Sequence, residues 1–213
     1  VLGPGLLEKN LDGLENDLDK MEGIFLRRGE YTFPLDEEKL WDFKPIAKVG
    51  DVVTAGSWLG EVDENFQPHK IMVPFTMNRQ YTLKSIAEAG EYNIYNTIAV
   101  VVDDEGNESE INMIQRWPVK IPITTYREKH RPYKLLETGV RSIDTLNPIV
   151  EGGTGFIPGA FGTGKTVLQH AISKQAEADI VIIAACGERA NEVVEIFTEF
   201  PELIDPHTGR KLM

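Results

Sequence analysis

The sequence has a single cysteine, Cys186, among its 213 residues. One thiol excludes an intrachain disulfide and a metal cage built from cysteines, and its scarcity fits a reducing compartment. Because Cys186 ends an apolar run, we expect a buried and inert thiol. His69 and His130 have no partner at metal-ligand spacing, so we expect no zinc-type site.

Long apolar runs are also missing. No stretch approaches the about 20 residues that span a bilayer. Val1 is not followed by the charged and apolar segments of a signal peptide. We therefore expect a soluble protein whose link to any membrane comes through its partners.

Positive charge is scarce, with 22 Lys and Arg residues against 34 Asp and Glu residues and a net charge of −12. An acidic chain of this kind argues against nucleic-acid binding, which needs a basic face. The imbalance is uneven, since residues 1–118 hold 22 acidic and 11 basic residues and residues 119–213 hold 12 and 11. The net charges of −11 and −1 indicate two regions of different character.

The pattern of apolar residues divides the chain into three parts. In residues 1–22, leucines recur at helical spacing and predict a short packing or linker helix: Leu7, Leu11, Leu14 and Leu18. Residues 23–118 contain short apolar runs separated by Gly and Asp, which is typical of a small antiparallel barrel or sandwich. We expect its tryptophans, Trp41, Trp58 and Trp117, to pack in or against it, and no catalytic cluster stands out there.

The pattern of apolar residues changes again in residues 119–213. We expect a short strand in residues 152–159, a helix in 165–178, a buried parallel strand in 179–186 and a second amphipathic helix in 191–200. The order of strand, loop, helix, strand and helix predicts an α/β P-loop nucleotide-binding domain with a parallel sheet, incomplete in this chain.

The segment "GAFGTGKT" matches the phosphate-binding pattern G-x-x-x-x-G-K-[ST] in full. Glycines let backbone N–H groups surround phosphate oxygens, and the following helix points its positive end at the same anion. Lys165 would reach the β- and γ-phosphates, and the Thr166 hydroxyl would bind Mg²⁺. The predicted contacts to ATP or ADP are Gly159, Ala160, Phe161, Gly162, Thr163, Gly164, Lys165, Thr166 and Val167.

Glu188 follows the predicted strand, at the edge where α/β sheets place their ligands. A carboxylate there could polarise the attacking water or be a solvated loop residue, and position alone leaves both open. Arg189 could bind phosphate or pair with a carboxylate. We expect His170, one turn beyond Thr166, to be a packing or surface residue.

These residues carry a resemblance to a known family. The segments "GGTGFIPGAFGTGKTVLQH", "CGERANEVVEIFTEFPELIDPHTGRKLM", "HKIMVP" and "RWPV", with "GPGLL" and "TGVRSIDTLNPI", resemble the catalytic A subunit of V-type and archaeal-type rotary ATPases. The resemblance runs over nearly the whole chain in the family's order.

The resemblance implies a cytoplasmic subunit, peripheral to the membrane, that alternates with B subunits in a ring and contacts central and peripheral stalks. ATP hydrolysis or synthesis there is coupled to H⁺ or Na⁺ transport. It implies that Glu188 is the general base and that Arg189 belongs to the phosphate-site network, so that Glu188, Lys165 and Arg189 are catalytic. Residues 23–118 would be the insertion that distinguishes A subunits, associated with stalk contacts.

Some positions depart from the family pattern. Where the family commonly reads "GERGNEM", this chain has Ala190 in place of the glycine and Val193 in place of the methionine. Asn147 replaces an aromatic residue of the family pattern. Thr163 stands where eukaryotic relatives have a cysteine, which excludes disulfide control there. These substitutions suggest a bacterial branch.

By the same resemblance, an N-terminal barrel would precede "GPGLL", and the Walker B strand would follow the last residue. We therefore expect a fragment, with residues 119–213 truncated before Walker B and negligible ATP turnover by this chain alone. The alternatives are a docking module for stalk subunits, a carrier domain with Lys70 as the modified lysine, and an F-type β, flagellar or Rho-like relative.

Overall fold

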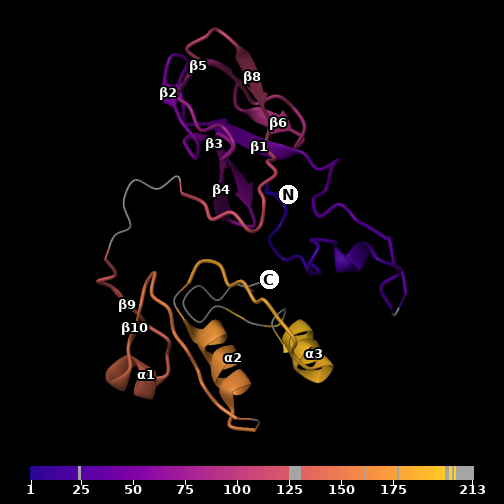
Figure 1. Ribbon diagram of the computed structural model, residues 1–213, viewed down its shortest axis with the longest axis vertical. Coiled ribbons are helices and arrows are strands. Elements are labelled where there is room, and N and C mark those ends of the chain that lie inside the picture. The colour runs from indigo at the N-terminus through magenta and orange to yellow at the C-terminus, as the bar shows by residue number, and fades with distance from the viewer. Residues whose placement is uncertain are drawn as a thin grey trace. The chain divides into compact units, whose positions relative to one another are not determined.

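The computed structural model describes residues 1–23, 25–124, 131–160, 162–176, 178–199, 202 and 204 (Figure 1). The chain divides into two compact units, residues 1–127 and residues 128–213. Each unit has its own secondary structure and is described by itself below. Among the described residues, no helix is long and apolar enough to cross a membrane.

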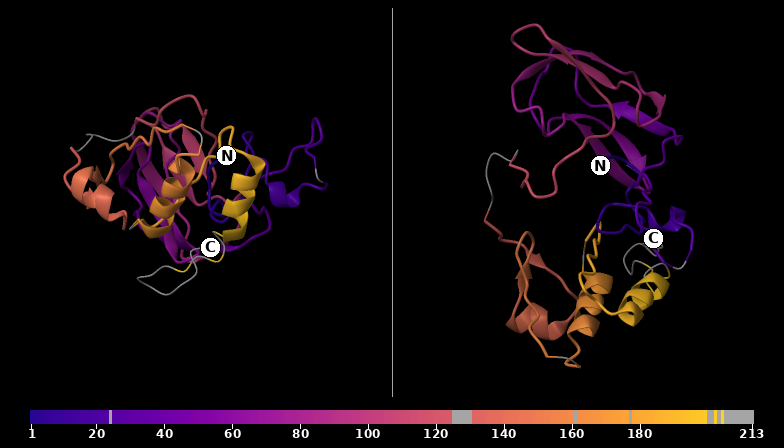
Figure 2. Two further views of the ribbon diagram at one scale, coloured as in Figure 1. Left: turned by 90° about the horizontal axis from the view of Figure 1, so that it is seen from below. Right: turned by 45° about the vertical axis from the view of Figure 1, so that its right-hand side comes forward.

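The first unit consists of two antiparallel sheets of four strands each (Figure 2). One sheet has the order β4-β3-β1-β6, with β4 at Gln67–Met72, β3 at Trp58–Glu64, β1 at Trp41–Pro45 and β6 at Gly90–Tyr92. The other has the order β2-β5-β7-β8, with β2 at Val52–Val53, β5 at Tyr81–Ile86, β7 at Ala99–Val102 and β8 at Glu108–Ile111. The prediction of a small antiparallel barrel or sandwich is therefore confirmed for this unit.

Two clusters of buried apolar side chains hold the sheets together. They arise from the alternation of inward and outward residues along the strands, as in β7, where Ala99 and Val101 are buried. The first cluster is centred on Phe43 and Val62, which have no exposed surface, and the second on Leu59 and Leu83, which have none either. Burial of these side chains is the main stabilising contribution to the unit.

The three tryptophans differ in their environments. Trp41 is buried in the first cluster, and the Trp117 ring packs edge-to-face on Phe75 at 5.6 Å between ring centroids. Trp58, which was expected to pack in or against the barrel, is 57% exposed and is not part of the buried core. The outward register of Trp58 at the start of β3 places its ring beside the Nζ of Lys70, which lies 5.2 Å from the ring centroid.

The predicted leucine helix in residues 1–22 is wrong, because this segment contains only a 3-10 turn, η1 at Leu18–Lys20. The Asp12 carboxylate accepts hydrogen bonds from the N–H groups of Leu14 and Asn16, each at 2.8 Å. Glu15 has φ of 68°, which no α-helix contains. Side-chain-to-backbone bonds of this type compete with helix formation and explain the failure of the leucine pattern.

Glu64 fastens this segment to the sheet. Its side chain is 3% exposed, and its Oε1 accepts hydrogen bonds from the N–H groups of Gly5 at 2.6 Å and Leu7 at 3.0 Å. Its Oε2 lies 2.6 Å from Nδ1 of His69 on β4. The first residues of the chain are therefore part of the first unit.

In the residues that the structure describes, the second unit contains one small hairpin and three helices. The strands β9, Leu135–Leu136, and β10, Ile149–Val150, pair antiparallel around α1, Arg141–Leu146. The helices α2, Lys165–Gln175, and α3, Ala190–Glu199, lie side by side (Figures 1 and 2) and are linked by an ion pair between Lys174 and Glu199. Both helices were predicted from the sequence and are confirmed.

The strands predicted in residues 152–159 and 179–186 are not formed among the described residues. The apolar run is open to solvent, with exposed fractions of 49% for Ile180 and 88% for Ile182. A strand is defined by hydrogen bonds to a neighbouring strand, and the only strand pair described in this unit is β9 with β10. Because the predicted strand that ends at Cys186 is not formed, Cys186 is exposed. The expectation of a buried thiol is therefore wrong.

Candidate functional site

The phosphate-loop sequence forms a tight glycine turn in front of α2. Gly162 and Gly164 have φ of 77° and 80°, in the left-handed region that residues with a Cβ rarely adopt. Gly159 is needed for a different reason, because a Cβ at this position would overlap the Oγ1 of Thr163. The pattern of glycines thus follows from backbone conformation at two positions and from close packing at the third.

Side chains of the loop hold it in a closed turn. Thr163 Oγ1 donates a hydrogen bond of 2.7 Å to the carbonyl of Ala160. Lys165 Nζ donates one of 3.4 Å to the carbonyl of Gly159. The lysine ammonium therefore lies over the mouth of the loop, where it can bind a phosphate oxygen. Phe161, predicted as part of the loop, lies outside the described residues.

The start of α2 offers backbone donors at the same place. Gly164 is the N-cap, and the first helical hydrogen bond runs from the N–H of Leu168 to the Gly164 carbonyl at 2.9 Å. The preceding N–H groups, of Lys165, Thr166 and Val167, have no acceptor within the helix. Together with the helix dipole they form an anion-binding position. The Thr166 side chain is half-buried in the first turn, and Val167 is 72% exposed.

Glu188 is placed near this loop by the turn that leads into α3. Gly187, with φ of 74°, precedes it, and α3 begins at Ala190. A hydrogen bond with the Glu192 carboxyl, together with repulsion by that carboxylate, raises the pKa of Glu188. Electrostatic interactions with Lys165 and His170 act in the opposite direction. The phosphate-loop lysine and the predicted base therefore share one electrostatic neighbourhood.

Two further predicted residues lie in this neighbourhood. Arg189 is exposed, and its carbonyl accepts the N–H of Val193 at 3.1 Å in the first turn of α3. His170, expected to be a packing or surface residue, is 8% exposed, which makes it the most buried side chain of α2 and a packing residue.

Glu192 is a residue of the site that the sequence reasoning missed. It lies four positions after Glu188 in the sequence, in the first turn of α3, which begins at Ala190. That spacing was the signal that could have found it.

No group of three or more potential metal ligands from His, Cys, Asp and Glu occurs among the described residues. His69 instead pairs with Glu64, and His130 lies outside the described residues. Lys70 is an interior residue of β4 and forms an ion pair with Glu61 across the β3–β4 hairpin. Lys70, the residue that a carrier domain would have modified, therefore has a structural contact with Glu61.

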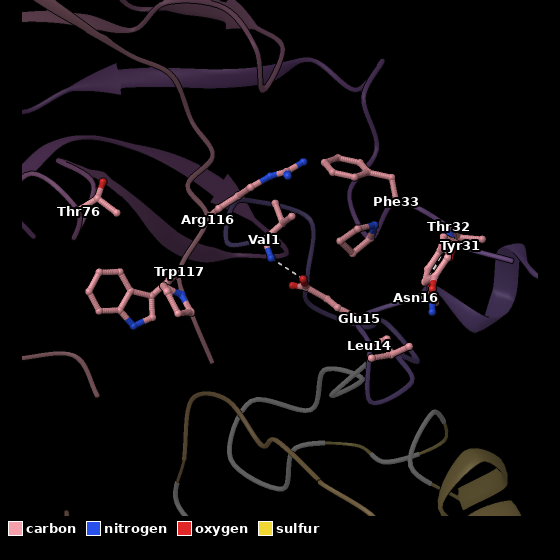
Figure 3. A pocket seen from close by; sticks show the side chains of 12 residues that line it. Val1, Leu14, Glu15, Asn16, Tyr31, Thr32, Phe33, Thr76, Arg116 and Trp117 are labelled. Carbon is pink, nitrogen blue, oxygen red and sulfur yellow. Dashed lines mark hydrogen bonds and ion pairs between the residues drawn. The ribbon is translucent and has the colours of Figure 1, made fainter. Parts of the chain in front are cut away.

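The first unit has a pocket of about 800 Å³, formed by the first residues of the chain, the segment before β1 and residues that follow β8 (Figure 3). Arg116 and Trp117 line it on one side and Tyr31 and Phe33 on the other (Figure 3). It contains none of the predicted site residues. The phosphate loop and Glu188 therefore remain the candidate site.

Comparison with known proteins identifies both units. Residues 32–120 match the model of the ATP synthase alpha/beta subunit barrel-sandwich domain. Residues 139–211 match the nucleotide-binding domain of the ATP synthase alpha/beta family. The chain belongs to the ATP synthase alpha/beta family. The predicted fold class, a nucleotide-binding domain joined to a β-rich domain, is confirmed by this pair of matches.

Within this family the similarity is to V-type alpha chains, which confirms the resemblance found in the sequence. The chain is 53% identical over 215 aligned positions to the V-type ATP synthase alpha chains of Borrelia garinii subsp. bavariensis and Borrelia hermsii, and 51% identical to that of Borreliella burgdorferi. All of this chain is aligned, and it spans 37% of the length of each of these relatives.

Proposed function

We propose that this chain is part of the catalytic subunit of a V-type rotary ATPase, in which ATP hydrolysis or synthesis is coupled to H⁺ or Na⁺ transport across a membrane. The observation that carries the proposal is the phosphate loop in front of α2 with Glu188 in the electrostatic neighbourhood of Lys165. The similarity to V-type ATP synthase alpha chains supports it. The subunit would be cytoplasmic and would act in a ring with B subunits and stalk subunits.

The proposed chemistry assigns a role to each residue. The N–H groups of residues 162–167 and the Lys165 ammonium bind and orient the phosphates of ATP or ADP. Glu188 accepts a proton from the attacking water, and Arg189 stabilises phosphate charge. The contacts from Gly159, Ala160 and Phe161 complete the loop.

Magnesium fits the donor set of this loop. The Thr166 hydroxyl is an oxygen ligand of the kind that Mg²⁺ takes, and it lies half-buried in the first turn of α2. When bound with the nucleotide, Mg²⁺ neutralises charge that develops on the phosphates. Thr166 is the residue of this chain that we propose as its ligand.

We also propose a separate role for each of three regions of the chain. Residues 119–213 would be the N-terminal part of the nucleotide-binding domain, and residues 1–22 a linker. Residues 23–118 would be the insertion that meets the peripheral stalk. The charge of the region up to residue 118, 22 acidic against 11 basic residues, favours a contact surface for a basic partner over a catalytic role.

Calorimetric titration of Mg·ATP into the chain tests the site. We expect binding that becomes about 10-fold to 100-fold weaker in Lys165→Ala, since a hydrogen bond to a charged group contributes about 1.5–3 kcal/mol. Lys134→Ala, which removes a lysine paired with Glu151 in the same unit, is the matched control and should bind as the parent does. Equal affinities of Lys165→Ala and the parent chain would contradict the assignment.

A further inference from the structure

The chain segments before and after the two sheets of the first unit are joined to each other. Leu2 and Gln115 form an antiparallel bridge, in which the N–H of Leu2 donates to the carbonyl of Gln115 at 2.8 Å. The N–H of Gln115 donates back to the carbonyl of Leu2 at 2.9 Å. The segment that leads to β1 and the segment that follows β8 therefore lie side by side.

Glu64 ties the first of these segments to the β3–β4 hairpin. Its Oε1 accepts the N–H groups of Gly5 at 2.6 Å and Leu7 at 3.0 Å, and its Oε2 lies 2.6 Å from Nδ1 of His69. The Glu64 side chain is 3% exposed, and hydrogen bonds to a buried carboxylate are stronger than the same bonds in water. Gly5 adopts φ of 101°, which a residue with a Cβ rarely does.

Gln115 ties the second segment to the end of the same hairpin. Its Oε1 accepts the N–H of Phe75, shortly after β4 ends at Met72, at 2.9 Å. Trp117 packs edge-to-face on Phe75, and its Nε1 donates to the carbonyl of Ile121 at 2.7 Å. One hairpin thus holds the chain on both sides of the sheets.

These contacts join three of the segments that carry the family resemblance. They are "GPGLL" at residues 3–7, "HKIMVP" at residues 69–74 and "RWPV" at residues 116–119. The candidate phosphate site uses none of them. Their meeting point at the hairpin gives the three segments a shared structural role that the nucleotide chemistry does not explain.

We propose that Glu64 and Gln115 form a clasp, which makes the first unit move as one body with the chain segments on both sides of its sheets. The clasp consists of the hydrogen bonds of Glu64, the bond from Phe75 to Gln115 and the bridge between Gln115 and Leu2. This inference rests on the proposed function, in which residues 23–118 meet the peripheral stalk. A force from a stalk subunit would then pass through the clasp to the rest of the subunit.

The spacing of the attachments argues for a stiff junction over a hinge. A hinge needs a few residues that are free to change φ and ψ. Residues 2–7 are held at Leu2, Gly5 and Leu7, so that no run of three consecutive residues between these points is without a bond to the sheet or to Gln115. Rotation about this segment would break several hydrogen bonds at once and leave buried groups unpaired.

The first test measures the clasp in this chain without nucleotide. In the parent chain, NMR residual dipolar couplings of residues 2–7 should fit the same alignment tensor as those of the sheets. The order parameters of the Gly5 and Leu7 N–H groups should be about 0.85, the value of rigid backbone. A separate alignment tensor for residues 2–7 would overturn the inference before any variant is made.

Variants then identify the residues responsible. In Glu64→Leu, which removes all acceptors of the carboxylate, we expect the order parameters of Gly5 and Leu7 to fall below about 0.6. Glu61→Leu, which removes a half-buried glutamate of the same strand, is the matched control and should leave them unchanged. Unchanged order parameters in a folded Glu64→Leu chain contradict the proposal.

Gln115→Leu provides the milder variant and decides the question if Glu64→Leu does not fold. We expect the order parameter of the Phe75 N–H to fall, because this variant removes its acceptor. Gln80→Leu, with an exposed glutamine of the same unit, is the control. An equally rigid Phe75 in Gln115→Leu and in Gln80→Leu would overturn the role of Gln115.

The second test uses the full-length subunit in its assembled complex, where ATP hydrolysis and ATP-driven ion uptake into vesicles are measured together. Glu64 and Gln115 lie outside the candidate site, so we expect Gln115→Leu and Glu64→Leu to retain hydrolysis but to move fewer ions per ATP. Full coupling in both variants would overturn the transmission of force. Retained hydrolysis in Lys165→Ala would instead overturn the proposed function and leave the order parameters of the clasp unaffected.

Discussion

Gly60 lies directly beneath the aromatic ring of Phe43, where the strands β3 and β1 pair in the first sheet. A Cβ at this position would overlap Cε2 and Cζ of the ring and would lie 2.7 Å from the carbonyl oxygen of Lys44. Phe43 has no exposed surface, and its ring is fixed from another side by an edge-to-face contact with Tyr92 at 6.2 Å between centroids. The Phe43 ring, which has no exposed surface, is thus accommodated because residue 60 has no Cβ.

The substitution Gly60→Ala should therefore destabilise the first unit by about 3 kcal/mol, because neither the ring nor the backbone oxygen can move away cheaply. Urea unfolding followed by tryptophan fluorescence measures the loss. Gly13→Ala is the matched control, since no atom lies within 4 Å of its Cβ position. A change in Gly60→Ala no larger than in the control would mean that the sheets adjust around the ring.

Glu64 should make the first unit sensitive to acid. Burial raises its pKa, but hydrogen bonds from His69 and from the N–H groups of Leu7 and Gly5 outweigh burial and hold the pKa below the ordinary 4.5. A carboxyl whose pKa is lowered in the folded state stabilises the protein above its ordinary pKa, and this contribution is lost as the pH falls through the lowered value.

The measurement is the difference in unfolding free energy between the parent chain and Glu64→Gln. We expect about 2–4 kcal/mol at pH 7, because the amide leaves buried donors poorly satisfied, and a smaller difference below pH 4.5. Glu61→Gln, which alters a more exposed ion pair with Lys70 on the same hairpin, should cost less than about 1 kcal/mol. A difference that stays constant with pH would show that Glu64 is not charged when folded.

The turn between β3 and β4 is strained in a way that one substitution can relieve. Asn65 and Phe66, with φ of 52° and 68°, form a two-residue loop that prefers Asn-Gly. Phe66→Gly creates this dipeptide, whereas Phe66→Ala removes the ring but keeps the strain. Because both variants lack the ring, the glycine variant should be about 1 kcal/mol more stable than the alanine variant in thermal unfolding. Equal stabilities would show that the turn relaxes at no cost.

The contact between Gly159 and Thr163 can be tested by a pair of substitutions. Gly159→Ala places a methyl group against Thr163 Oγ1, breaks its hydrogen bond to Ala160 and should weaken binding of Mg·ATP. Adding Thr163→Ala removes that oxygen and leaves the new methyl group 3.4 Å from Cβ of residue 163. We expect the double variant to bind more tightly than Gly159→Ala alone, as measured by calorimetry. Strictly additive losses would contradict this local clash.

The parts of the fold that sequence reasoning predicted are those fixed by local pattern. The short strands of the first unit follow from alternation and glycine turns, and the helices α2 and α3 follow from apolar spacing after a helix start. The leucines of residues 7–18 show the opposite case. Their spacing fits a helix, but the carboxylate of Asp12 captures the backbone N–H groups that a helix would need.

Prediction at the site is limited where an interaction depends on the folded conformation of the backbone. The glycines and Lys165 of the phosphate loop are recognisable because their spacing follows from the backbone. Glu192 was missed, since its effect on the pKa of Glu188 depends on how the turn before α3 is folded. The run at residues 179–186 has the composition of a buried strand, but a strand also needs a hydrogen-bonding neighbour, which sequence composition does not supply.

The apolar run at residues 179–186 affects how the protein should be stored. Ile180, Val181 and Ile182 are exposed by 49%, 44% and 88%, and they belong to an apolar stretch that carries no charge between Asp179 and Glu188. Such a stretch can pair with the same stretch of another molecule and start aggregation. The excess of 12 negative charges on the chain keeps molecules apart at low salt. We expect shelf life to shorten as added salt screens this repulsion, so dilute, low-salt storage should preserve the protein.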